Sequence, residues 1–270
     1  MSSSLWLQHL DLIPRRRCKI SSRVKTGILG LDKMIGGGLP GGYCYLLLGG
    51  PGAGKTTFGV QYLVNGILNQ SETGIYVTLD EPPFSVRNNM RENFGWDLLN
   101  LEDKMKLAIV DASPMEIDVS AKTLKIKGAL GTEDFSIDSV LGLISEAKRR
   151  VTPSAKRCVI DSISGLLFQY ESPFQQRQHL LKLMKGLTEM RLTTLLLGEL
   201  PEETIDYQRF GPEAFLAQGV FVMHNIRTKN TITQVFQIRK LRGQKFSREM
   251  IPYNIGDDGV EVYPGEKVFT

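Results

Sequence analysis

Short apolar runs alternate with segments of helical spacing between about residue 43 and residue 199. An apolar run of about four to eight residues between turn signals is typical of a buried strand, whereas apolar residues three and four apart are typical of a helix packed on one face. Strands that alternate with helices predict a parallel sheet covered by helices on both faces. The predicted strands are residues 43–49, 74–79, 106–111, 157–162 and 192–199, and the predicted helices are residues 55–69, 84–94, 136–150 and 173–190.

The pattern changes in the last quarter of the chain, where strand-like runs follow one another without helical segments between them. Residues 26–42 predict a short helix that ends in a glycine turn, and residues 123–131 predict an exposed hairpin. Because no internal repeat or low-complexity linker interrupts the chain, we expect one domain over residues 21–270, preceded by a basic N-terminal arm over residues 1–20. The late runs predict an antiparallel extension of the sheet and cover residues 219–227, 232–243, 249–255 and 259–264.

Composition narrows the class of protein only a little. The chain has 270 residues, of which 41% are hydrophobic, so it can bury a sizeable core. Its net charge of +4 permits contact with nucleic acid but does not argue for it. No apolar run reaches the roughly 18 residues that a membrane helix needs, and the N-terminus lacks the charge order of a secretory signal. Cys18, Cys44 and Cys158 show no metal-ligand spacing. We therefore expect a cytoplasmic protein with no membrane partner and no zinc site.

Residues 49–56, "GGPGAGKT", fit the phosphate-binding pattern G-x-x-x-x-G-K-[ST] at every position. Glycines let the backbone turn tightly, so that successive N–H groups point at one phosphate group, and the N-terminus of the following helix favours the negative charge. In this pattern Lys55 reaches the β- and γ-phosphates and the Thr56 hydroxyl binds Mg²⁺. The residues expected to bind the nucleotide are Gly50, Gly52, Ala53, Gly54, Lys55, Thr56 and Thr57.

Four acidic residues stand at the ends of predicted strands, where the ligand crevice of a parallel sheet lies. Asp161 ends the run "RCVID" and is the candidate to hold Mg²⁺ with Thr56. Asp80 and Glu81 precede two prolines and are the candidates to activate water, although only one of them would face it if the strand continued through both. Glu199 is either a γ-phosphate sensor or an ordinary acid at a strand end. Ser162 and Ser164 follow Asp161 and are expected to line the same crevice.

Several motifs appear in an order that resembles the KaiC family, a branch of the RecA/DnaB-like ATPases. They include "TGILGLDKMIGGGLPGG", "GGPGAGKTTF", "YVTLDEPP", "VIDSISGLLFQY" and "QIRKLRG", and together they extend over roughly residues 21–264. The likeness is to one KaiC domain, and most to its N-terminal, ATP-hydrolysing half. It implies a RecA-like P-loop core, with a mainly parallel twisted sheet and an antiparallel C-terminal extension. Because single-domain versions are common in archaea, it also implies an archaeal source.

The resemblance further implies a homo-oligomer, a hexameric ring with ATP between neighbouring subunits. The resemblance implies that Asp80 and Glu81 correspond to the family's acidic pair, and that Asp161 corresponds to its Mg²⁺-binding acid. Lys240 and Arg242 of "KLRG" reach the γ-phosphate of the next subunit's ATP. Positive charge aimed at the transferring phosphoryl group stabilises the transition state, so the chemistry is reasonable.

The chain departs from the family pattern in three places. The family usually carries Glu-Glu where this chain has Asp80 and Glu81, so either Glu81 activates the water or hydrolysis is slow. Residues 209–219 contain no serine or threonine, whereas the self-phosphorylating half of KaiC has both there, so autokinase activity is not expected. Phe246 stands near the place where the clock protein has a histidine, so that contact is expected to be absent.

Three functions fit these observations, and we expect the first. It is a slow ATPase whose ring responds to its nucleotide and regulates an unknown protein partner. The second is a recombinase paralogue that binds single-stranded DNA through basic and aromatic loops. Residues 199–215 are acidic on balance, which counts against DNA. The third is an ATP-bound scaffold that does not hydrolyse its nucleotide.

Overall fold

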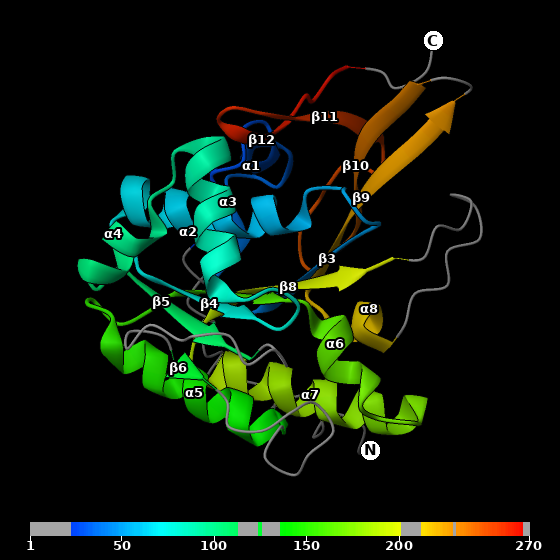
Figure 1. The fold of residues 1–270 in the computed structure, drawn as a ribbon. Coiled ribbons are helices and arrows are strands. Elements are labelled where there is room, and N and C mark those ends of the chain that lie inside the picture. The colour runs from blue at the N-terminus through cyan, green and yellow to red at the C-terminus, as the bar shows by residue number, and fades with distance from the viewer. Residues whose placement is uncertain (1–22, 113–123, 126–135, 201–211, 229–230, 267–270) are drawn as a thin grey trace, which may run out of the picture.

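The computed structural model describes residues 23–112, 124–125, 136–200, 212–228 and 231–266. The predicted N-terminal arm therefore lies outside the described residues. Within them no helix is long and apolar enough to cross a membrane. Most of the chain forms one large sheet with helices on both faces (Figure 1).

The described strands of the large sheet follow the order β12-β11-β10-β9-β3-β8-β7-β4-β5-β6. The neighbours from β9 to β6 pair in parallel, and β10, β11 and β12 pair antiparallel at the other side. Both predictions about the sheet are thus confirmed. The strands are β3 Cys44–Gly49, β4 Gly74–Thr78, β5 Leu107–Asp111, β6 Leu124–Lys125, β7 Arg157–Asp161, β8 Thr193–Glu199, β9 Gly219–Thr228, β10 Thr231–Leu241, β11 Met250–Gly256 and β12 Gly259–Val262; β1 Arg23–Val24 and β2 Leu39–Pro40 form a separate pair.

Two layers of helices bury the two faces of the sheet (Figure 1). Side chains of a strand alternate between faces, so Leu46 and Leu48 of β3 enter one core cluster while Tyr45 and Leu47 enter the other. All six residues of β3 are buried because both faces are covered. The first layer contains α1 Leu31–Met34, α2 Lys55–Gln70, α3 Pro83–Phe94 and α4 Leu98–Asp103, and the second contains α5 Ile137–Arg150, α6 Ile163–Phe168, α7 Pro173–Glu189 and α8 Pro212–Leu216.

Three short helices, α4, α6 and α8, were not predicted from the sequence. Each has only five or six residues, which is too few for a helical period to be recognised. The predicted hairpin at residues 123–131 lies mostly outside the described residues. Its described part, β6, pairs in parallel with β5 and so extends the edge of the large sheet.

A buried ion pair joins α3 to α4. Arg87 donates from Nε to Glu102 Oε2 at 2.8 Å and from Nη2 to Glu102 Oε1 at 2.9 Å, and the two side chains are 9% and 4% exposed. By contrast, Arg150 and Glu146 form a pair on the surface of α5, with side chains 45% and 41% exposed. The same chemical change should therefore have unequal effects at the two sites.

We predict that Glu102→Gln lowers the free energy of unfolding by about 3 kcal/mol, because it removes the buried carboxylate to which Arg87 donates two hydrogen bonds. The matched change Glu146→Gln should cost less than about 1 kcal/mol, because water screens an exposed pair. Urea unfolding of both variants checks this. Equal losses would show that the Arg87 pair does not hold α4 in place.

Candidate functional site

The glycine loop connects β3 to α2 in a conformation that only glycine adopts easily. Gly52 and Gly54 have φ angles of +69° and +87°, in the left-handed region. A side chain at Gly54 would also collide with Ile255, whose Cδ1 lies 2.4 Å from the position of a Cβ. The Tyr253 hydroxyl donates to the Ala53 carbonyl at 2.7 Å. The antiparallel extension thus fixes the shape of the loop.

Lys55 is folded back onto this loop. Its Nζ donates to the carbonyl oxygens of Gly49 at 2.9 Å and Gly50 at 3.0 Å. Desolvation by burial lowers the pKa of Lys55, and the carboxylates of Asp161, Glu199 and Asp80 act in the opposite direction. An ammonium group that is half-buried and held only by neutral carbonyls is well placed to bind phosphate oxygens instead.

The Asp161 carboxylate meets two hydroxyl groups at the end of β7. Thr56 Oγ1 donates to Asp161 Oδ2 at 2.7 Å, and the Tyr76 hydroxyl donates to the same oxygen at 2.9 Å. Asp161 is 8% exposed, and burial raises the pKa of its carboxyl although both hydrogen bonds oppose the rise. The peptide bond from Asp161 to Ser162 is cis.

The Thr56 and Asp161 pair fits a magnesium ion. Mg²⁺ prefers oxygen ligands and is usually held by one or two protein groups together with phosphates and waters. A hydroxyl and a carboxylate already in contact supply two such ligands. No cluster of three or more His, Cys, Asp or Glu residues in the described part of the chain could hold a metal by itself. A divalent ion at this pair would therefore need phosphate oxygens as well.

A cavity of about 210 Å³ is lined by three of the predicted catalytic residues, Lys55, Asp80 and Glu81. Because β4 ends at Thr78, Asp80 and Glu81 both lie beyond the strand, and both line the cavity. The sequence predicted that only one of the two acids would face the water if the strand continued through both. Because β4 ends before them, that restriction does not apply. The full lining is Lys55, Thr56, Thr78, Asp80, Glu81, Asp161, Ser162 and Glu199.

A larger cavity of about 620 Å³ adjoins the first. Thr56 and Glu81 line both of them, and Thr57 lines only the larger one, between α2, α3 and the end of β11. Five of the predicted nucleotide-binding residues thus border two neighbouring spaces, namely Lys55, Thr56, Thr57, Asp161 and Glu199. The smaller one is acidic and next to Lys55, and the larger one has room for the rest of a nucleotide.

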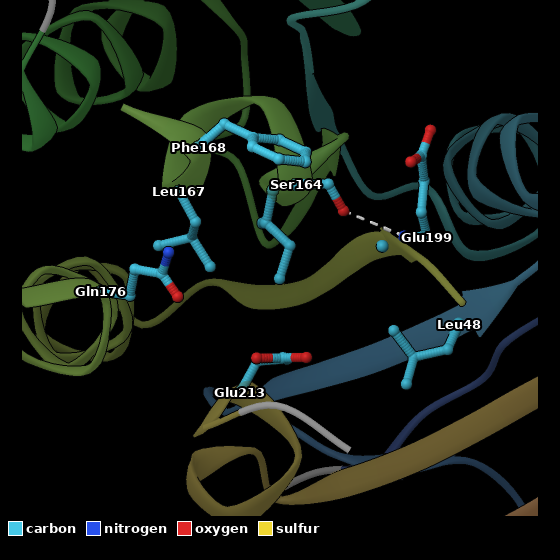
Figure 2. A pocket seen from close by; sticks show the side chains of 9 residues that line it. Leu48, Ser164, Leu167, Phe168, Gln176, Glu199 and Glu213 are labelled. Atoms are coloured by element: carbon cyan, nitrogen blue, oxygen red, sulfur yellow. Dashed lines mark hydrogen bonds between the residues drawn. The ribbon is translucent and has the colours of Figure 1, made fainter. Parts of the chain in front are cut away.

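Glu199 lies between the catalytic cavity and a third one, of about 300 Å³, beside α6 (Figure 2). Its backbone N–H donates to Ser164 Oγ at 3.0 Å, as the dashed line in Figure 2 shows. In this view the Glu199 carboxylate points away from Glu213, which lines the third cavity. Its position beside Lys55 and Asp161 suits a γ-phosphate sensor, which stays a prediction.

A family model described as "ATPase: KaiC" matches residues 24–267. The chain belongs to the KaiC family. It is 34% identical over 241 residues to the circadian clock oscillator protein KaiC of Prochlorococcus marinus subsp. pastoris, and 32% identical over 243 residues to that of Synechococcus elongatus. These matches cover 89% and 90% of this chain but 45% and 44% of those proteins, so the chain spans less than half of their length.

A solved structure extends the comparison to the fold. A KaiC-like protein of the hyperthermophilic archaeon Pyrococcus horikoshii OT3 aligns with a TM-score of 0.74 and 36% identity, over 90% of this chain and 100% of that one. The predicted RecA-like fold and the likeness to the N-terminal half of KaiC are confirmed. The chain is a KaiC-like ATPase domain. An archaeal source stays a prediction.

The two basic residues of "KLRG" do not line any of the three cavities described above. Lys240 is near the end of β10 and Arg242 follows that strand, and both side chains donate to carbonyl oxygens of α8. This placement is compatible with a role in the neighbouring subunit, which stays a prediction. Phe246 packs against the core cluster that contains α2, so it serves as a partly buried apolar contact.

Two tyrosines of the site were not identified from the sequence. Tyr76 lies in a strand that was predicted to be buried, and a buried tyrosine hydroxyl usually needs a partner, so it could have been paired with the acid at the neighbouring strand end. Tyr253 gave no such signal, because it contacts Ala53 across 200 residues of sequence. Of the two serines expected in the crevice of Asp161, Ser162 lines the catalytic cavity, whereas Ser164 lines the third cavity.

We predict that Asp161→Asn raises the melting temperature of the nucleotide-free protein at pH 7.5 by about 2–4 °C, since about 1 kcal/mol corresponds to such a shift in a chain of this size. A carboxyl whose pKa is raised on folding destabilises the fold at pH values above its folded pKa, because its charged form is then the disfavoured one. The gain should therefore shrink as the pH falls through the raised pKa.

Differential scanning fluorimetry at pH 7.5 and pH 5 measures this effect. The matched variant Asp80→Asn, at an exposed acid of the same cavity, should leave the melting temperature nearly unchanged. A lower melting temperature for Asp161→Asn at pH 7.5 would mean that the hydrogen bonds from Thr56 and Tyr76 outweigh the cost of burial.

Proposed function

We propose that this domain binds ATP with Mg²⁺ and hydrolyses it slowly at the subunit interfaces of a cytoplasmic homo-oligomeric ring, with six subunits as in the predicted hexamer. The ring would serve as a nucleotide-dependent regulatory assembly for a protein partner. The observation that carries this proposal is the 2.7 Å contact between Thr56 and Asp161, in a cavity that also contains Lys55, Asp80 and Glu81.

The glycine loop and Lys55 bind the triphosphate in this proposal. Lys55 Nζ exchanges the carbonyls of Gly49 and Gly50 for phosphate oxygens, which are stronger acceptors. Thr56 and Asp161 hold the magnesium ion, which when bound neutralises the charge that develops on the phosphates. The positive charges close to Asp161 favour its ionised form and so oppose the effect of burial.

Asp80 and Glu81 are the groups that orient and deprotonate the attacking water. Asp80 acts electrostatically on both Lys55 and Asp161, which supports a role for it beside the expected γ-phosphate. Its side chain is one methylene shorter than the glutamate usual in the family, and this difference supports a slow rate. Glu199 completes the acidic wall of the cavity.

Cations from a neighbouring subunit would balance this acidic wall. Lys240 and Arg242 point to carbonyls outside their own cavity, so they remain candidates to reach the γ-phosphate of the next subunit's ATP. Autokinase activity is not part of the proposal, because residues 209–219 carry no hydroxyl side chain of serine or threonine. DNA binding is not favoured either, since Glu199 and Glu213 place negative charge around α6.

We expect Mg²⁺-dependent release of phosphate from ATP that single-stranded DNA at low salt does not change. Lys55→Ala should abolish both the release and the binding of nucleotide, because it removes the cation that meets the phosphates. Stimulation by DNA would favour a recombinase paralogue, and tight binding without release would favour an ATP-bound scaffold. Retained nucleotide affinity in Lys55→Ala would contradict the assignment of the glycine loop.

A second prediction separates the two acids. Asp80→Asn should lower kcat by about 100-fold or more, the usual contribution of a general base, while Glu81→Gln should lower it by less than about tenfold. Asp80→Glu should raise kcat, because it restores the longer reach. Steady-state kinetics over a range of ATP concentrations checks all three variants. A larger loss in Glu81→Gln than in Asp80→Asn would assign the water to Glu81.

A further inference from the structure

A β-bulge in β10 determines which side of the strand Lys240 and Arg242 are on. The pairing of β10 with β9 is regular up to Ile238 and then shifts, so that Lys240 pairs with Val220. An extra residue in a strand exchanges the faces of all side chains that follow. As a result Ile238 and Leu241, three residues apart, are both buried, and the two cations lie on the opposite side of the strand from Leu241.

Both cations are held by the backbone of α8. Lys240 Nζ donates to the carbonyl oxygens of Ala214 and Phe215, each at 2.9 Å. Arg242 Nη2 donates to the same Phe215 oxygen at 2.9 Å. One carbonyl therefore joins the two side chains, and a second one fixes the lysine.

The position of α8 is itself fixed by the core. Ala214 and Ala217 are buried in the cluster that lies under α5 and α7. The Gln218 N–H donates to the Cys44 carbonyl at 2.8 Å, and the Arg242 N–H donates to the Gln218 carbonyl at 2.9 Å. The helix and the end of β10 are thus tied to each other and to β3, the strand that carries the glycine loop.

The two cations keep donors for an anion. An ammonium group has three N–H donors and a guanidinium has five. Lys240 gives two of its donors to α8 and Arg242 gives one, so a phosphate group can bind without displacing either contact. Burial, and to a smaller extent the nearby charge of Arg242, lowers the pKa of Lys240.

We infer that α8 is a positioning element of the proposed ATPase: the Ala214 and Phe215 carbonyls hold Lys240 and Arg242 in the orientation in which they meet the γ-phosphate of the neighbouring subunit. This inference rests on the proposed function of the two cations and adds the segment that aims them. Donors that are already oriented stabilise a transition state without reorganising during the reaction. The cations alone, on long side chains, would have to be ordered at each turnover.

The double variant Ala214→Gly/Phe215→Gly tests this role. Glycine weakens the short helix and frees its carbonyls, while both cations and the glycine loop remain. We expect kcat to fall by about tenfold, the effect of slightly misplaced groups, with KM for ATP changed by less than about twofold. The matched control is Leu99→Gly/Asn100→Gly in α4, a short helix on the other face of the sheet, which should keep the wild-type kcat.

Two further measurements separate positioning from a general loss of structure. In rings mixed with Lys55→Ala subunits, which carry an intact α8, the glycine variant should recover hydrolysis, because its own ATP then meets correctly held cations. In the background of Arg242→Ala, the glycine changes should cause little additional loss. Absence of recovery in demonstrated mixed rings, or losses that simply multiply, would overturn the inference.

The outcome for Arg242→Ala distinguishes the inference from the proposal on which it rests. Full hydrolysis by Arg242→Ala rings would contradict the proposed role of the cations, and the inference with it. If Arg242→Ala loses hydrolysis while the glycine variant of α8 behaves like the α4 control, the cations act as proposed and only the role of α8 is wrong.

Discussion

The site depends on the parallel pairing of β3, β8, β7 and β4, because this pairing brings all their carboxyl ends to one edge of the sheet. The register places Gly49 opposite Glu199, and Asp161 opposite Thr78. The glycine loop, the Thr56 partner and the acid pair all begin within a few residues of these ends. A shift of one residue in β7 would turn Asp161 to the other face of the sheet and separate it from Thr56.

The same arrangement of strand ends has a cost in free energy when no ligand is bound, because it brings charged groups together in a partly buried site. Asp161 is buried against hydroxyl groups, and Lys55 satisfies its ammonium with two backbone carbonyls instead of an anion. Asp80, Glu81 and Glu199 add negative charge to one small cavity. Groups that burial and like charge destabilise in the free protein gain most when phosphate and a cation arrive, so the site favours a nucleotide bound together with a metal ion.

Much of the fold and of the candidate site could be predicted from the sequence, because the strands that build the site are apolar runs and the glycine loop follows a fixed spacing. The predicted strands end at residues 79, 162 and 199, each within one residue of the observed ends at Thr78, Asp161 and Glu199, so the acids at these ends could be expected near the loop. The short helix α8 could not be predicted, since five residues carry no helical period. Nor could its contacts with Lys240 and Arg242 be foreseen, because they depend on a bulge in β10 and join residues 25 to 27 positions apart. Local spacing predicts elements, whereas contacts between elements require the packed structure.

The charges of the chain give a physical reason for the proposed assembly. Acidic side chains line the cavity at the ends of the parallel strands, whereas Lys240 and Arg242 are held by α8 outside that cavity. Two complementary surfaces that cannot meet within one chain favour contact between copies, and a contact between different surfaces is head-to-tail. Such a contact closes into a ring or continues as a filament, depending on the rotation from one subunit to the next. The contacts with the α8 carbonyls restrict where Lys240 and Arg242 can reach. They therefore also restrict which rotations allow the two cations to contact the neighbour's nucleotide.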